Sequence, residues 1–131
     1  GEGEYFREAL ADINDILKPG GVVGVVQHRA QEDMPDDWAK GDNGYMKRSQ
    51  IVAIFEQAGF ELVGESDVNA NPADRPTADE FVWRLPPTLA TSQEDPELRA
   101  AMKAIGESDR MTLNSANRRN RRAFPRAARL V

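Results

Sequence analysis

Three consecutive polar side chains, Gln27, His28 and Arg29, are the residues best placed to do chemistry, because they directly follow an apolar run over residues 22–26. His28 is the only histidine. An imidazole can take or give a proton near neutral pH, so it could orient or deprotonate a substrate group. The alternative is a loop histidine hydrogen-bonded to the backbone, since the sequence fixes no acid beside it. We predict His28 as catalytic and Gln27 and Arg29 as substrate-binding.

The segment over residues 30–44 is predicted to form a loop beside this site. Its carboxylates and the single histidine match no spacing of metal ligands, so we predict a solvated acidic loop and no metal site. Trp38 and Tyr45 either close this loop over the site as a lid or pack it down, and packing is the commoner role. Tyr45 is the fourth predicted site residue, as a substrate contact. Ser66 and Ser108 have no base placed by sequence, so nucleophilic catalysis has no support.

A helix, a turn and a strand must position the polar triplet. Apolar residues at three- and four-residue spacing predict an amphipathic helix over residues 4–17, ended by Pro19-Gly20-Gly21. The β-branched run over 22–26 has no polar alternation, which is typical of a strand covered on both faces in a parallel α/β sheet. The carboxyl end of such a strand faces a ligand crevice. The glycines precede the strand, the reverse of a phosphate-binding loop, so we predict a structural turn and no cofactor-binding residue.

The rest of the chain continues this alternation. We predict a helix over 49–58 capped by Ser49, a strand over 60–66, a short strand over 81–85, a helix over 95–105 and the start of a last strand over 110–113. The pattern predicts an α/β sheet with crossover connections. Two or three strands are too few for such a sheet, so we expect missing strands on its N-terminal side. We expect one unit over 1–113 and a disordered tail over 114–131.

Charge divides the chain in the same way. The 131 residues carry a net charge of −5, but the tail holds six arginines and no acid, so the preceding part is strongly acidic. An acidic body does not attract nucleic acid or anionic membranes, whereas the tail could bind nucleic acid non-specifically. No cysteine is present, and no apolar run approaches the roughly 20 residues of a membrane span. The N-terminus is unlike a signal peptide and lacks a methionine, so we expect a cytoplasmic protein whose native N-terminus is missing.

Residues 9–23, centred on Leu17-Lys18-Pro19-Gly20-Gly21, resemble the late part of class I S-adenosylmethionine-dependent methyltransferases, where a helix ends in this motif before the fifth strand. Further segments resemble one branch of that superfamily, the predicted methyltransferases of bacterial genomes. They are Val26-Gln27-His28-Arg29-Ala30, Asn43-Gly44-Tyr45, Ala58-Gly59-Phe60-Glu61-Leu62, Asn69-Ala70-Asn71-Pro72-Ala73-Asp74, Val82-Trp83-Arg84-Leu85-Pro86-Pro87 and Ile105-Gly106-Glu107-Ser108-Asp109-Arg110-Met111-Thr112-Leu113. The match extends over residues 4–113.

The resemblance implies the C-terminal portion of a Rossmann-like, seven-stranded methyltransferase sheet, holding strands five, six and the beginning of seven. Strand seven is expected to run antiparallel, beside strand five and paired with strand six. The glycine-rich loop and the ribose-binding acid that hold S-adenosylmethionine belong to the N-terminal half, which this sequence lacks. The chain is then expected to contribute the acceptor side of the site, for a small-molecule methyl acceptor, and to be inactive alone. From residue 114 the chain departs from the family pattern abruptly, as a shifted reading frame does.

Two other functions stay open at this point. A sheet without its first strands exposes an edge, which favours a non-catalytic α/β interaction module that forms a homodimer through that edge. The arginine-rich tail allows a nucleic-acid binder driven by electrostatics, although its single aromatic residue and lack of periodicity argue against a recognition module.

Overall fold

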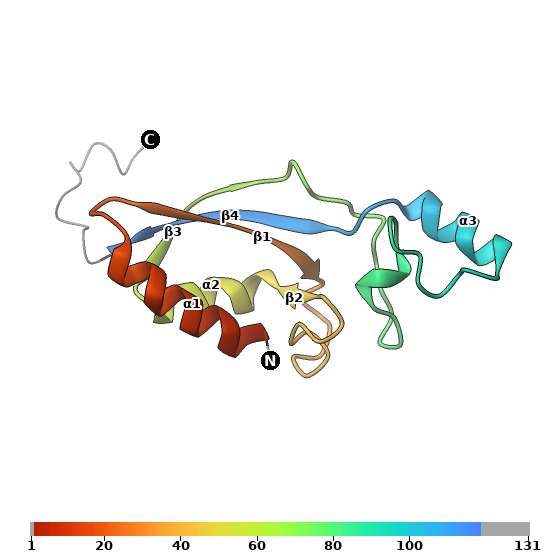
Figure 1. Ribbon diagram of the computed structural model, residues 1–131, viewed down its shortest axis with the longest axis horizontal. Helices are drawn as coiled ribbons and strands as arrows, with labels where there is room; N and C mark the ends of the chain where they lie inside the picture. Colours follow the sequence, from red (N-terminus) through yellow and green to blue (C-terminus); the bar gives the residue numbers. More distant parts are fainter. Residues whose placement is uncertain (1, 119–131) are drawn as a thin grey trace.

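A computed structural model of the chain describes residues 2–118, in which two helices pack on one face of a four-stranded mixed sheet (Figure 1). A third helix lies beyond one end of the sheet. The elements are α1 (Glu2–Ile16), β1 (Val22–Ala30), β2 (Met46–Lys47), α2 (Arg48–Gln57), β3 (Phe60–Ser66), a 3₁₀ helix η1 (Val82–Arg84), α3 (Pro96–Ile105) and β4 (Arg110–Asn117). The predicted α/β class is confirmed.

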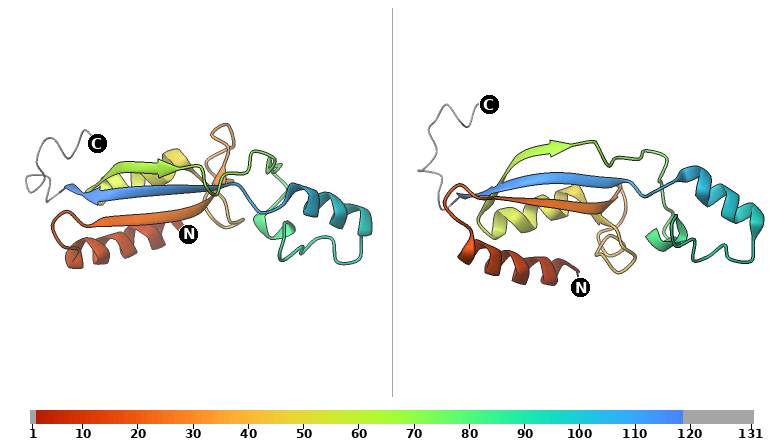
Figure 2. Two further views of the ribbon diagram at one scale, coloured as in Figure 1. Left: turned by 90° about the horizontal axis from the view of Figure 1, so that it is seen from above. Right: turned by 45° about the horizontal axis from the view of Figure 1, so that its top comes forward.

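The strand order is β2-β1-β4-β3, and β4 runs antiparallel to both of its neighbours. Figure 2 shows β4 lying between β1 and β3 along most of its length. In this register Val22 lies opposite Ala116 and His28 lies opposite Arg110. The expected placement of the last strand, antiparallel and beside the first, is therefore confirmed. It brings the start of β4 to the carboxyl end of β1, some 80 residues away in sequence.

The main core lies between the sheet and the α1–α2 pair. Its buried residues are Leu10, Met46, Ile51, Ile54, Phe55, Phe60, Met111 and Leu113. Val23 and Val25 of β1 pack against this core, whereas Val22 and Val26 point to the other face and are each 53% exposed. The prediction that β1 is covered on both faces is wrong for the part of the chain described, because α1 and α2 both lie on one face. An apolar run does not say on which side its helices pack.

The outer edge of β1 is open over much of its length. Two backbone hydrogen bonds show which residues of β1 face β4. The Asn117 amide donates to the Gly21 carbonyl, and the Arg29 amide donates to the Asp109 carbonyl. Because ladder bonds alternate along a strand, the backbone groups of the even-numbered residues of β1 face away from β4. β2 pairs with β1 only at Arg29 and Ala30. Within residues 2–118, the preceding stretch of that edge has no strand beside it.

Two segments near the site differ from expectation. Residues 82–84, predicted to lie within a strand, form η1, because the Val82 amide bonds to the Asn43 carbonyl and the following prolines cannot donate to a ladder. The strand β4 continues to Asn117, four residues into the segment predicted as a tail. Its polar residues Ser115 and Asn117 are buried rather than solvated. The remainder of that tail, from residue 119, lies outside the described residues.

The ends of the helices are decided by local chemistry. The N-cap of α2 is Lys47, whereas the predicted cap, Ser49, lies inside the helix and bonds to the Glu32 side chain. For α3 the N-cap is Asp95, which accepts the Leu98 amide, as a short polar residue before Pro-Glu predicts. This helix ends at Gly106, where φ is +87°. α3 and η1 both lie beyond the carboxyl end of β1 (Figure 1).

Candidate functional site

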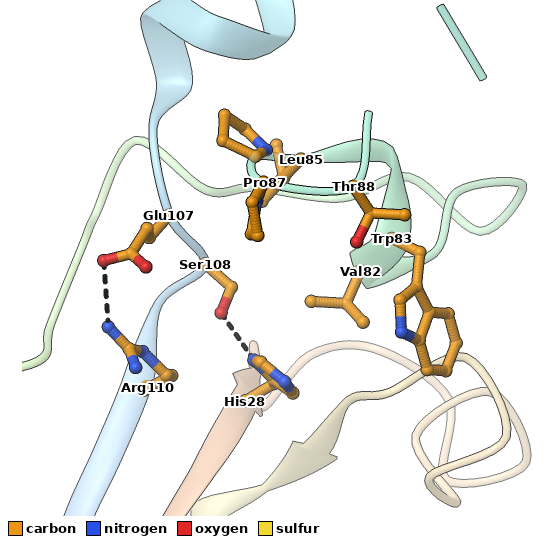
Figure 3. A pocket seen from close by; sticks show the side chains of 10 residues that line it. His28, Val82, Trp83, Leu85, Pro87, Thr88, Glu107, Ser108 and Arg110 are labelled. Carbon is orange, nitrogen blue, oxygen red and sulfur yellow. Dashed lines mark hydrogen bonds and ion pairs between the residues drawn. The ribbon is translucent and has the colours of Figure 1, made fainter. Parts of the chain in front are cut away.

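A partly enclosed cavity of about 190 Å³ lies at the carboxyl end of β1 (Figure 3). Three segments build it: the carboxyl-terminal end of β1, the segment from η1 to residue 88, and the turn that leads into β4. The lining residues are His28, Val82, Trp83, Leu85, Pro86, Pro87, Thr88, Glu107, Ser108 and Arg110. The strand that the sequence singled out thus ends at a cavity, as the carboxyl ends of strands in α/β sheets do.

The polar centre of this cavity is the pair His28 and Ser108. The Nδ1 atom of His28 lies 2.5 Å from the Oγ atom of Ser108, and the tautomer of the ring decides which of the two donates. Figure 3 shows the two side chains pointing toward each other from β1 and from the turn before β4. The pair forms a short path for a proton between a bound hydroxyl and the imidazole.

Sequence reasoning missed Ser108, because nothing local places a base beside it. The signal that could have found it is the expected pairing of the last strand with β1. His28 lies opposite Arg110 in that register, so the residue just before β4 is brought near His28. Ser108 is only 5% exposed, so solvent contacts it chiefly through the cavity.

Tyr45, predicted as a substrate contact, lies instead in the protein core, fully buried. Its hydroxyl donates to the Asp74 carboxylate (2.8 Å to Oδ2) and accepts from Nη1 of Arg84 (2.9 Å). Burial raises the pKa of this hydroxyl well above its ordinary value, and the hydrogen bond to Asp74 adds to the rise. The ring stacks on Trp38 with centroids 5.4 Å apart. These positions agree with the packing alternative for the two aromatics, so we treat Tyr45 as a positioning residue.

Asp74 and Arg84 form a buried ion pair that holds the wall of the cavity in place. Nη2 of Arg84 lies 2.9 Å from Oδ1 of Asp74, with side-chain exposures of 3% and 0%. Burial opposes the charge on Arg84, but hydrogen bonds to Asp74 and Tyr45 outweigh it and raise the pKa of the guanidinium. The Asp109 amide also donates to Asp74, at 3.0 Å. This network therefore joins η1 to the turn that carries Ser108.

Gln27 and Arg29 lie outside the cavity, because alternate residues of a strand point to opposite faces. Arg29 binds the Asp109 carboxylate through Nε and Nη2, at 3.0 and 2.8 Å. That hydrogen bonding raises the pKa of the Arg29 guanidinium. Gln27 donates to the Gly44 carbonyl at 3.0 Å. Of the four predicted site residues, the structure brings His28 alone to the cavity; Arg29 lines a separate open depression beside Arg48.

The glycines around β1 form a turn rather than a phosphate-binding loop. The Gly20-Gly21 pair precedes β1 as a turn: Gly20 has φ of +81°, and a Cβ on Gly21 would lie 2.5 Å from the Leu17 side chain. No glycine-rich loop follows a strand and opens a helix in residues 2–118, which is the arrangement that holds a pyrophosphate or an adenosyl group.

Clusters of metal-ligating side chains and membrane-spanning helices are both missing from the described part of the chain. Residues 2–118 contain no group of three or more His, Asp or Glu side chains that could hold a metal ion. Within the same range, no helix has the length and apolar character needed to cross a membrane. No protein-family model matches the chain, and comparisons with curated proteins and with solved structures give no match.

Proposed function

We propose that this chain is the C-terminal part of a class I S-adenosylmethionine-dependent methyltransferase and supplies the acceptor side of its site. The observation that carries the proposal is the order β1-β4-β3 with β4 antiparallel to both neighbours. This is the order that the resemblance implies for strands five, seven and six. The open edge of β1 is where strand four of that sheet would pair, and the exposed face of Val22 and Val26 is where further helices would pack.

The contribution of this chain to the reaction would be to bind the acceptor and receive its proton. A hydroxyl in the cavity can donate to Oγ of Ser108 while the Ser108 proton moves to Nδ1 of His28. His28 is thus the base, and Ser108 passes the proton to it. General-base catalysis contributes roughly 10²–10⁴-fold to a reaction rate. Loss of His28 is therefore expected to lower the rate of methyl transfer by the whole enzyme by a factor in that range.

The test is to read the coding DNA on both sides of this segment and to express the extended polypeptide. We expect an upstream glycine-rich strand-to-helix loop. Calorimetric titration should then detect micromolar binding of S-adenosylmethionine to the extended polypeptide and none to the present chain. Micromolar binding by the present chain, or an upstream sequence without that loop, would contradict the proposal.

A second candidate function is a homodimerising interaction module, favoured by the same open edge of β1. The even-numbered backbone groups face that edge, and Gly24 lies among them between Val22 and Val26. Two copies can therefore pair antiparallel about Gly24, which places Val22 of one opposite Val26 of the other. In light scattering, a dimer whose mass falls on dilution supports this candidate, and a monomer at all concentrations contradicts it. Val26→Lys should dissociate the dimer, whereas Val63→Lys, on the far strand β3, should leave it intact.

A further inference from the structure

We infer that the cavity beside His28 binds a single-ring phenol, whose hydroxyl lies against the His28–Ser108 pair. The inference rests on the proposed function in one respect, because it names the class of methyl acceptor. The binding itself requires only residues of this chain. Three properties of the cavity carry it: its size, its charge and the chemistry of its polar pair.

The size of the cavity matches one ring. Its volume is about 190 Å³, and an apolar cavity of about 150 Å³ in another protein is large enough to bind benzene. A benzene ring with one or two small substituents therefore fits inside it. Apolar side chains supply much of the wall: Val82, Trp83, Leu85, Pro86 and Pro87.

The charges of the lining favour a neutral ligand. Glu107 and Arg110 are its two ordinarily charged residues, and they pair with each other across 3.3 Å. The two charges cancel, so a protonated amine or an ionised carboxylic acid would enter a partly apolar lining of zero net charge, and its desolvation costs free energy. A ligand that is uncharged at neutral pH avoids this cost.

The His28–Ser108 pair selects among neutral ligands. In the tautomer whose Nδ1 accepts from Ser108, the Oγ atom keeps lone pairs for the ligand, so the complementary group is a proton donor. A phenol is the best match, because a phenolic hydroxyl such as that of an unperturbed tyrosine has a pKa of about 10. It is neutral at pH 7, donates a strong hydrogen bond and can still yield its proton to a base. A thiol is a weaker donor, and an aliphatic alcohol is a much weaker acid.

The experiment is a nuclear magnetic resonance titration of this chain with phenol, anisole and cyclohexanol. We expect phenol to shift the resonances of His28, Ser108 and Trp83 with a Kd on the order of 1 mM, a range ordinary for so small a ligand. Anisole keeps the ring but cannot donate, so it should bind about 10-fold more weakly. Cyclohexanol keeps the hydroxyl without the flat ring and should also bind more weakly than phenol.

Variants separate the hydrogen bond from the packing. Ser108→Ala should weaken phenol binding about 10-fold and leave anisole binding unchanged, whereas Ser108→Thr keeps the hydroxyl and should restore phenol binding. Ser66→Ala is the matched control, since Ser66 is an exposed serine on β3 outside the cavity. The amide spectrum of each variant reports whether it folds. If Ser108→Ala does not fold, the comparison of phenol with anisole on the unchanged chain decides the matter.

Several results would overturn the inference: anisole or cyclohexanol binding as tightly as phenol, shifts confined to residues away from the cavity, or no shift at all. Failure here is distinguishable from failure of the proposed function. If the extended polypeptide binds S-adenosylmethionine and phenol does not bind, the acceptor class is wrong and the methyltransferase proposal stands. If phenol binds and the extended polypeptide does not bind the cofactor, the phenol site stands without that function.

Discussion

The ion pair between Arg84 and Asp74 is the interaction whose disruption should have the largest effect on stability. Both side chains are almost completely buried, at 3% and 0% exposure. Arg84→Met keeps most of the apolar stem and removes the charge, so Asp74 is left as a buried anion without its cation. The Tyr45 hydroxyl and the Asp109 amide would still donate to Asp74.

The expected loss follows from that arrangement. Removing one partner of a buried ion pair typically costs about 3–5 kcal/mol, because the remaining charge is uncompensated. Two donors remain on Asp74, so we expect the lower end, about 3 kcal/mol. This is a large fraction of the roughly 5–15 kcal/mol that stabilises a domain. With an m-value of about 1.5 kcal/mol/M, the midpoint of urea unfolding should fall by about 2 M.

The assay is urea unfolding followed by far-ultraviolet circular dichroism, with Arg48→Met as the matched control. Arg48 also makes two hydrogen bonds to a carboxylate, that of Glu65, but these side chains are 38% and 51% exposed. Exposed pairs contribute less than about 1 kcal/mol, so the control midpoint should move little. If Arg84→Met shifts the midpoint no more than Arg48→Met does, the buried pair does not hold this end of the sheet together. The same variant should also weaken phenol binding, because Arg84 lies in η1.

Three further predictions concern single positions. Gly44→Ala should lower the free energy of unfolding by about 2–4 kcal/mol, because φ is +94° and the new Cβ would lie 2.2 Å from a Val82 methyl group. Gly64→Ala is the control, because a Cβ there has its nearest atom at 3.9 Å. It should cost less than about 0.5 kcal/mol in the same urea assay. Burial tends to raise the pKa of Glu80, but hydrogen bonds to Thr77 and attraction to Arg84 outweigh it, so the pKa is lowered. Because its pKa is lower in the folded state, ionised Glu80 contributes stability above its unfolded-state pKa of about 4.3. That contribution is lost as the pH falls through the folded-state pKa. Glu80→Gln should therefore cost about 0.5–1 kcal/mol at pH 7 and nothing at pH 2, and an equal cost at both would contradict this. Because the pKa of Tyr45 is raised in the folded state, its stabilising contribution is complete below about pH 10 and is lost above it. A Tyr5→Phe variant leaves Tyr45 as the sole tyrosine. In that variant, tyrosinate absorbance should appear only together with unfolding.

Local patterns were sufficient to predict most elements of the fold. The strand β3 lies over residues 60–66 as expected, and α3 begins after Asp95 and ends at Gly106 as its capping residues predict. These signals are local: a helix depends on three- and four-residue spacing and on its caps, and a strand on a short apolar run between turns. The position of His28 at the end of β1 follows from the same reasoning.

The site required the tertiary structure. Nothing within a few residues of Ser108 indicates that it contacts His28, because the contact depends on how β4 pairs with β1. Tyr45 could not be assigned from sequence either. Its burial depends on Asp74 and Arg84, which lie 29 and 39 residues further along the chain. A polar aromatic beside a predicted site is compatible both with a ligand contact and with a buried network, although packing is the commoner role.

By itself, the sequence determined that this chain forms an α/β unit with a histidine near the carboxyl end of a strand, since hydrophobic periodicity and turn residues act over short distances. The pairing of β4 between β1 and β3, the placement of both helices on one face and the meeting of His28 with Ser108 were decided only in three dimensions. The physical reason is that strand register and side-chain burial depend on groups far apart in the chain, whose contacts exist only once the sheet has formed.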